Sequence, residues 1–187
     1  HFRKIIPMAH QVFIDGEAGT TGLQIRERLA KLDGVVQVRS IAADKRKDAG
    51  ARKALMAETD LIVLCLPDDA AKESVALADS LGAKGPKIVD ASTAHRVDPT
   101  WVFGFPEMTG EQAGLIAKAR RVSNPGCYPT GAIALLRPLV DAGLLPRDYP
   151  VTVSRTGYAI TDGSGAVVAV PDASVAWGSD PAAIDVT

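Results

Sequence analysis

Residues 11–22 read QVFIDGEAGTTG, and this stretch decides the fold. Residues 11–15 form a short apolar run typical of a β-strand, and three glycines spaced as Gly16-x-x-Gly19-x-x-Gly22 follow it directly. Apolar residues then recur at helical spacing, at positions 23, 25, 29 and 32. A glycine loop between a strand and a helix is the setting in which such spacing indicates a dinucleotide site. A glycine-rich turn without a ligand is the alternative interpretation of the loop taken alone.

Downstream of the loop, apolar runs alternate with helical patterns. We expect further strands at residues 35–41, 61–66, 87–90 and 121–123, and helices at 68–81 and 109–119. Residues 44–58 read as a loop or helix, residues 103–107 as irregular, and Asp68 or Asp69 as the cap of the helix that follows Pro67. This alternation predicts an α/β protein with a doubly wound parallel sheet of Rossmann type, whose ligands bind at the carboxyl ends of the strands.

Composition excludes several classes of function. The 187 residues carry a formal net charge of -1, without the cationic excess that a nucleic-acid partner requires. No apolar run approaches the roughly 20 residues that span a bilayer. Two cysteines form no disulfide framework and no zinc spacing, so we expect a cytoplasmic protein without a bound metal. Residues 1–7 are expected to be a tag or leader, with Met8 as the native start.

The end of the second expected strand indicates which dinucleotide binds. Arg39 and Ser40 follow Val38, and Lys45, Arg46 and Lys47 come soon after. Cations at this place suit the 2′-phosphate of NADP, whereas an acidic residue would suit NAD, so we predict NADP(H) as the cofactor. The alternative is that these cations form a solvated helix face. The expected cofactor contacts are Gly16, Ala18, Gly19, Thr20, Thr21, Gly22, Arg39, Ser40, Leu66 and Pro67.

Cys127 lies in the turn SNPGCYPTG of residues 123–131, which leads directly into the apolar stretch 132–140. The pattern places this sulfur at a helix N-terminus, where unpaired N–H groups and the helix dipole favour the nucleophilic thiolate. Cys65, within a continuous apolar run, instead reads as a buried structural residue. We therefore predict Cys127 as the catalytic nucleophile.

Four segments together resemble N-acetyl-gamma-glutamyl-phosphate reductases, in particular their type 2 branch. They are the cysteine segment 123–130, the glycine loop 16–22, DASTAHR at 90–96 and FGFPE at 103–107, and the resemblance covers about residues 9–153. It implies NADPH-dependent reductive dephosphorylation of N-acetyl-L-glutamyl 5-phosphate to the 5-semialdehyde, through a Cys127 thioester, in arginine biosynthesis.

Substrate contacts are expected from Ser92, Arg96, Asn124 and Gly126. The guanidinium of Arg96 suits a phosphate or a carboxylate. Backbone N–H groups around Gly126 are candidate oxyanion donors. His95 is expected to be a loop or pocket-wall residue, because the catalytic histidine of the family lies well downstream of its cysteine.

After about residue 153 the chain departs from the family pattern. We expect a cofactor-binding domain at 8–126, and at 127–187 the cysteine helix with only the beginning of a second α/β substrate domain. The family resemblance implies a homo-oligomer formed through that further domain. Without the family's histidine, the chain is expected to bind NADP(H) but to turn over poorly by itself. Alternative functions are an enzyme resembling aspartate-semialdehyde dehydrogenase and a non-catalytic dinucleotide-binding module.

Overall fold

The computed structural model describes residues 9–149, 151–154, 157–161 and 167–168, with side chains up to residue 149. The chain divides into two compact units, of which the first comprises residues 1–104 and 113–124 and the second residues 105–112 and 125–187. Compactness does not report which part binds a cofactor, so the domain boundary expected after residue 126 stays a prediction.

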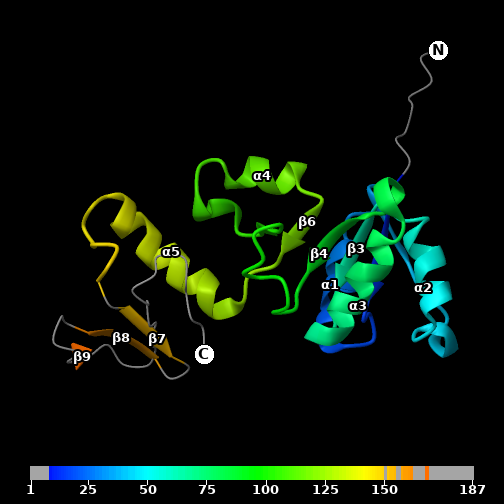
Figure 1. The fold of residues 1–187 in the computed structure, drawn as a ribbon, viewed down its shortest axis with the longest axis horizontal. Helices are drawn as coiled ribbons and strands as arrows, with labels where there is room; N and C mark the ends of the chain where they lie inside the picture. The colour runs from blue at the N-terminus through cyan, green and yellow to red at the C-terminus, as the bar shows by residue number, and fades with distance from the viewer. Residues whose placement is uncertain (1–8, 150, 155–156, 162–166, 169–187) are drawn as a thin grey trace, which may run out of the picture. The chain divides into compact units, whose positions relative to one another are not determined.

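A six-stranded parallel sheet forms the centre of the first unit (Figure 1). Its spatial order is β2-β1-β3-β4-β6-β5, and every neighbouring pair in it is parallel. β2 is an edge strand next to β1, and β3 lies on the other side of β1. The strand order therefore reverses at the carboxyl end of β1. The strands are β1 (His10–Asp15), β2 (Val36–Arg39), β3 (Leu61–Leu64), β4 (Lys87–Asp90), β5 (Val102–Phe103) and β6 (Arg121–Ser123).

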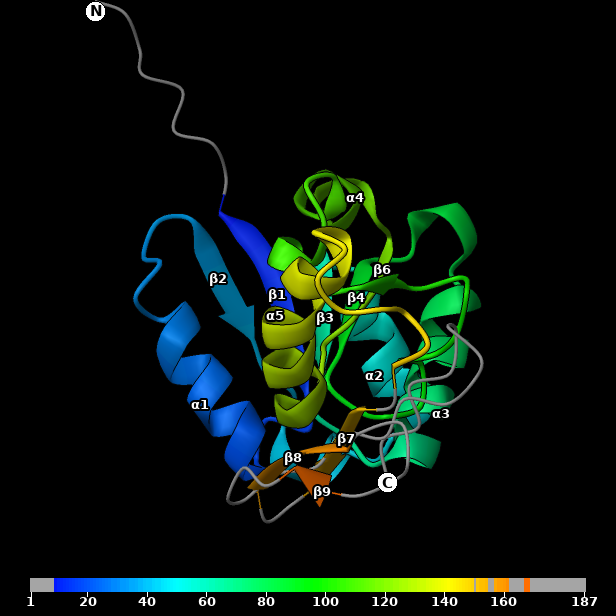
Figure 2. The same cartoon turned by 90° about the vertical axis from the view of Figure 1, so that its left-hand side faces the viewer.

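Helices cover both faces of this sheet, which confirms the predicted doubly wound fold. Figure 2 shows α1 on the opposite side of the sheet from α2 and α3. The helices are α1 (Thr20–Leu29), α2 (Ala49–Met56), α3 (Asp68–Asp79) and α4 (Gln112–Lys118), with short 3₁₀ turns η1 (Ala43–Lys45) and η2 (Gly82–Lys84).

The main core lies between the sheet and the pair α2 and α3. Burial of each large aliphatic side chain stabilises the fold by about 1.5–3 kcal/mol. Alternate positions of the strands supply the sheet side of this core and apolar positions of α2 and α3 the other. Its buried members are Phe13, Met56, Ile62, Leu64, Ala71, Val75, Ala78, Ile88 and Trp101. The strand from which the glycine loop starts is therefore anchored in this core through Phe13.

Two local predictions were wrong. Pro67, rather than Asp68 or Asp69, is the N-cap of α3, because the Asp68 carboxylate accepts hydrogen bonds from Thr93 N–H and Oγ1 instead. The stretch expected to be irregular contains the end of edge strand β5 and the turn η3 (Pro106–Met108). Two paired residues are too few to show the alternation by which a strand is recognised in a sequence.

The second unit contains α5 (Cys127–Asp141), which packs Ala132 against Leu136, Leu145 and Tyr149. A three-stranded antiparallel sheet follows, formed by β7 (Val151–Ser154), β8 (Gly157–Thr161) and β9 (Val167–Val168). The leader expected at 1–7 lies outside the described residues. Within the described residues, no helix has the length and apolar character needed to cross a membrane.

Candidate active site

The carboxyl ends of four neighbouring strands are tied together by backbone hydrogen bonds. The bonds run from Cys65 N to Asp15 O at 2.8 Å, from Ala91 N to Leu64 O at 3.0 Å and from Asn124 N to Asp90 O at 2.7 Å. The glycine loop, the end of β3, the loop after β4 and the start of the cysteine turn therefore share one edge of the sheet. Doubly wound sheets bind their ligands at this edge.

Two of the three loop glycines are required by close backbone packing. A Cβ on Gly16, whose φ is +91°, would lie 2.3 Å from Cys65 O, and a Cβ on Gly22 would lie 2.5 Å from Gly16 O. The loop is thus pressed against the end of β3, and α1 is pressed against the loop. Leu66 borders the loop as well, because its Cδ2 would lie 3.2 Å from the same Cβ on Gly16.

The first turn of α1 offers free donors next to this loop. Gly19 is its N-cap and no side chain caps the helix, while residues 18–21 are exposed. A Cβ on Gly19 would have only Gly16 O nearby, at 3.5 Å. An uncapped helix start that is open to solvent and free of bulky side chains fits the pyrophosphate of a dinucleotide. The loop residues predicted to bind the cofactor are therefore placed together.

Ser40 and Arg39, both predicted as cofactor contacts, are separated by the structure. Ser40 Oγ donates to Glu17 Oε2 at 2.9 Å, so it lies beside the glycine loop. The guanidinium of Arg39 instead lies 3.2 Å from Glu58 Oε2 and 3.4 Å from Gln11 Oε1. Successive side chains of a strand point to opposite faces, which explains the separation.

Two other cations lie beside Ser40 and the glycine loop, one that the sequence did not indicate and one that belongs to the basic run after β2. Arg26 on α1 donates to Glu17 and to Ser40, and Arg46 lies 3.6 Å from Glu17 Oε1. Arg46 belongs to the basic run that motivated the NADP prediction, whereas Arg26 reads in the sequence as an ordinary polar position of an amphipathic helix. Only the packing of α1 against β2 brings the two arginines to one carboxylate.

Below the loop, a buried ion pair fixes the end of β1. Arg52 Nη2 donates to Asp15 Oδ2 at 2.6 Å, and Ser74 Oγ donates to the same oxygen at 2.7 Å. All three residues are buried. A buried carboxylate is tolerated when it is paired and hydrogen-bonded, and here α2 and α3 supply the partners. The residue that precedes Gly16 is therefore held by both helices.

The loop after β4 is organised by Asp90, which is fully buried. Its carboxylate accepts from Ser92 Oγ at 2.7 Å and from Ser92 N at 2.9 Å, and it lies 2.6 Å from His95 Nδ1. The ring of His95 also stacks on Trp101, with 4.3 Å between centroids. The hydroxyl proton of Ser92 and one ring nitrogen of His95 are thereby engaged in shaping the loop. The substrate contact expected from Ser92 stays a prediction.

Arg96 follows this network and is half-buried. Its Nη2 donates to Ala91 O at 3.2 Å, and its Nε is buried without a hydrogen-bond partner among the described residues. An arginine whose donors are incompletely satisfied is suited to gripping an anionic ligand. The N–H of Asn124, another expected substrate contact, donates to Asp90 O, and Gly126 is the N-cap of α5.

Cys127 is the first residue of α5 and is exposed. No side chain caps this helix, and the hydroxyl of Thr130 donates back to Gly126 O at 2.8 Å. Cys65, in contrast, is half-buried, and burial together with the nearby carboxylates of Asp15 and Asp90 raises the pKa of its thiol to about 11. The two thiols differ in the way expected from the sequence, with Cys127 accessible and Cys65 held neutral.

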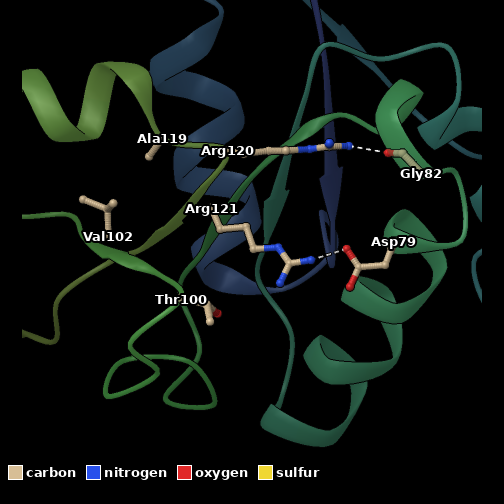
Figure 3. A pocket seen from close by; sticks show the side chains of 7 residues that line it. All are labelled: Asp79, Gly82, Thr100, Val102, Ala119, Arg120 and Arg121. Carbon is tan, nitrogen blue, oxygen red and sulfur yellow. Dashed lines mark hydrogen bonds and ion pairs between the residues drawn. The ribbon is translucent and has the colours of Figure 1, made fainter.

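Figure 3 shows a pocket of the first unit away from this edge. It lies near the amino ends of β5 and β6, and its lining includes Val102, Arg120 and Arg121. Arg120 donates to Gly82 O at 2.6 Å and Arg121 pairs with Asp79, so both guanidinium groups are already bound to the protein. Because the strands are parallel, the amino ends of β5 and β6 place this pocket at the end of the sheet opposite to the glycine loop.

Part of the chain matches a known protein family. Residues 48–116 match the family described as "Semialdehyde dehydrogenase, NAD binding domain". This match agrees with the parallel sheet and confirms the predicted Rossmann-type dinucleotide-binding architecture. Solved structures show the same fold. An aspartate semialdehyde dehydrogenase II from Vibrio cholerae aligns with a TM-score of 0.53 at 18% identity, over 72% of this chain and 47% of its own.

Curated relatives carry the family name expected from the sequence. N-acetyl-gamma-glutamyl-phosphate reductase from Brucella suis is 55% identical over 152 residues, which are 81% of this chain and 48% of that protein. The enzyme of the same name from Chelativorans sp. is 53% identical over the same shares. The family resemblance predicted from the sequence is thus confirmed over the matched residues. The chain spans about half the length of the curated relatives it matches.

Proposed function

We propose that this chain supplies the NADP(H)-binding part and the nucleophile of an N-acetyl-gamma-glutamyl-phosphate reductase, an oxidoreductase of arginine biosynthesis. The observation that carries the proposal is an exposed cysteine at the first position of an uncapped helix, in a sequence 55% identical to enzymes of that name. The substrate would be N-acetyl-L-glutamyl 5-phosphate and the product its 5-semialdehyde.

In the first step, the Cys127 thiolate attacks the acyl carbon of the substrate. A carbon–sulfur bond forms, the bond from that carbon to the phosphate oxygen breaks, and inorganic phosphate leaves with the bonding electrons. Cys127 is exposed at the first position of α5, so its sulfur is open to the acyl carbon. The resulting thioester has a carbonyl carbon that accepts hydride, which a carboxylate does not.

Negative charge develops on the carbonyl oxygen during attack. The uncapped first turn of α5 presents backbone N–H groups close to the sulfur, and these are the candidate donors for that oxygen. Arg96, with its unpartnered Nε, is the candidate to hold the phosphate or the carboxylate of the substrate.

The dinucleotide would be held by the glycine loop and the first turn of α1. Both fit it, since the loop is open over Gly19 and the helix start is uncapped. When bound, the reduced nicotinamide supplies the hydride that converts the thioester to the aldehyde level. Cleavage of the carbon–sulfur bond would then release the semialdehyde and leave Cys127 with a free sulfur again.

The proposal is tested on the first half-reaction, which needs no cofactor. The 187-residue chain is incubated with N-acetylglutamyl 5-phosphate, and the protein is analysed by mass spectrometry before and after peptide digestion. We expect one N-acetylglutamyl group per chain, on Cys127, with release of one phosphate. Cys65→Ser is the matched control and should acylate normally, whereas Cys127→Ser should not.

Three results would count against the proposal. Acylation that persists in Cys127→Ser would remove the nucleophile from it. Faster acylation by β-aspartyl phosphate would favour the alternative, an enzyme resembling aspartate-semialdehyde dehydrogenase. A chain that binds dinucleotide but accepts neither acyl phosphate would be the non-catalytic module.

A further inference from the structure

Glu17 is a buried carboxylate at the edge of the proposed cofactor site, and its side chain is only 8% exposed. It follows Gly16 directly and has three side-chain partners, one on α1, one just after β2 and one just after η1. Its Oε2 accepts from Arg26 Nη1 at 2.9 Å and from Ser40 Oγ at 2.9 Å, and its Oε1 lies 3.6 Å from Arg46 Nη2. An unpaired buried carboxylate would be costly, so these partners belong to the loop's stability.

The two arginines are only partly used by this carboxylate. Their side chains are 41% and 43% exposed, so donors of both guanidinium groups remain open to solvent. Two cations against one anion leave an excess of one positive charge, and Lys45 and Lys47 flank Arg46. Guanidinium groups bind phosphate through several parallel hydrogen bonds, and they bind best when they are held in place beforehand.

The location matches one particular phosphate. Ser40 follows the last residue of β2, and β2 lies next to β1 in the sheet. In dinucleotide-binding folds the end of this strand faces the adenosine ribose, where an acidic residue selects NAD and cations accommodate the 2′-phosphate of NADP. Here Ser40 follows the end of this strand. The nearby acidic residue is Glu17, which belongs to the glycine loop and is paired with Arg26 and Arg46.

We propose that Arg26 and Arg46 bind the 2′-phosphate of NADP(H), and that Glu17 is the positioning residue that holds both guanidinium groups ready for it. This inference rests on the proposed function for the presence of a dinucleotide, but it assigns the discrimination between NADP and NAD to residues outside the glycine pattern. Arg39, which points to Gln11 and Glu58, takes no part.

A positioning role for Glu17 and a simple effect of its charge predict opposite changes in NADPH binding when Glu17 is replaced by glutamine. Replacing Glu17 by glutamine removes a negative charge from the site, so charge alone would strengthen the binding of a phosphate. If Glu17 instead acts by positioning, Glu17→Gln releases Arg26 and Arg46 and weakens NADPH binding. The sign of the change therefore separates the two explanations.

The experiment measures the dissociation constants of NADPH and NADH for the 187-residue chain by titration of nicotinamide fluorescence. We expect wild type to prefer NADPH, and Arg26→Met and Arg46→Met each to weaken NADPH binding about tenfold, the loss of one charge-assisted interaction. Glu17→Gln should weaken it several-fold. NADH affinity should stay unchanged in all three, which also reports that the loop is folded.

Arg28→Met is the matched control, because Arg28 is an exposed cation on the same helix but two positions away, on another side. It should leave both constants unchanged. Ser40→Ala, which removes only the hydroxyl between Arg26 and Glu17, gives a second reading if Glu17→Gln does not fold, and it too should weaken NADPH alone.

The outcomes separate the inference from the function beneath it. Binding of neither dinucleotide by wild type overturns the proposed cofactor site and the inference with it. Tighter NADPH binding by Glu17→Gln, or loss of the preference in Arg39→Met with none in Arg26→Met, overturns the inference alone.

Discussion

Gly16 and Cys65 approach so closely that no side chain fits between them. The Cβ of any other residue at position 16 would lie 2.3 Å from the carbonyl oxygen of Cys65 and 2.8 Å from its carbonyl carbon. This contact presses the loop after β1 against the end of β3. The glycine pattern in this chain is therefore a packing requirement as well as a ligand-binding one.

Gly16→Ala should destabilise the protein by about 3 kcal/mol or more, from the backbone clash added to the strain of a positive φ. Gly34→Ala is the matched control, since Gly34 also has a positive φ, +75°, but has no neighbouring atom within 4 Å of the added Cβ. Its cost should be about 1 kcal/mol. Free energies of unfolding from urea titration compare the two, and equal losses would show that the close approach does not matter.

The ion pair between Arg52 and Asp15 should be the most sensitive of the described polar contacts to a single substitution. Arg52→Leu leaves a buried carboxylate with Ser74 as its remaining side-chain partner, and should cost about 3–5 kcal/mol. Arg39→Leu breaks an exposed pair with Glu58 and should cost about 1 kcal/mol or less. Urea unfolding of both variants measures the difference. A loss below about 1 kcal/mol for Arg52→Leu would contradict the assigned role of the pair.

The sequence was most informative where a feature is local. The loop spacing at residues 16–22 and the turn before Cys127 predicted a glycine loop and a cysteine at a helix start, because each depends on neighbours along the chain. The cluster of Glu17, Arg26 and Arg46 could not be predicted in this way. It depends on how α1 and the segment after β2 pack together. Arg39 points to Gln11 and Glu58 instead, because successive side chains of a strand alternate between its two faces.

The N-cap of α3 also depends on a contact that is distant in the sequence. Asp68 has the residue type and position of a helix cap, yet its carboxylate is hydrogen-bonded to Thr93 in the loop after β4. These hydrogen bonds, led by the one from the Thr93 hydroxyl, hold the pKa of Asp68 below its usual value. A local preference was overridden by a partner 25 residues away.

Stability at alkaline pH should depend on Cys65. Its pKa is raised from 9.0 to about 11 in the folded protein, first by burial and then by Asp15 and Asp90. Between these two values the unfolded chain has lost the proton and the folded chain keeps it, so the free energy of unfolding falls as the pH rises. Cys65→Ala should lose less stability than wild type between about pH 9 and pH 11. Parallel declines of the two proteins, measured by urea unfolding, would contradict this.

Alkylation should distinguish the two cysteines sharply. Cys127 is exposed at the start of α5, whereas Cys65 is half-buried and its raised pKa keeps that thiol neutral. Iodoacetamide below pH 7.5 should therefore label Cys127 and spare Cys65, as followed by mass spectrometry of peptides over time. Cys65→Ser should label at the wild-type rate, and Cys127→Ser should stay unlabelled until it is unfolded in urea, when Cys65 reacts. Equal labelling of both cysteines in the folded chain would mean that the helix start confers no special reactivity. That result would contradict the assignment of Cys127 as the nucleophile.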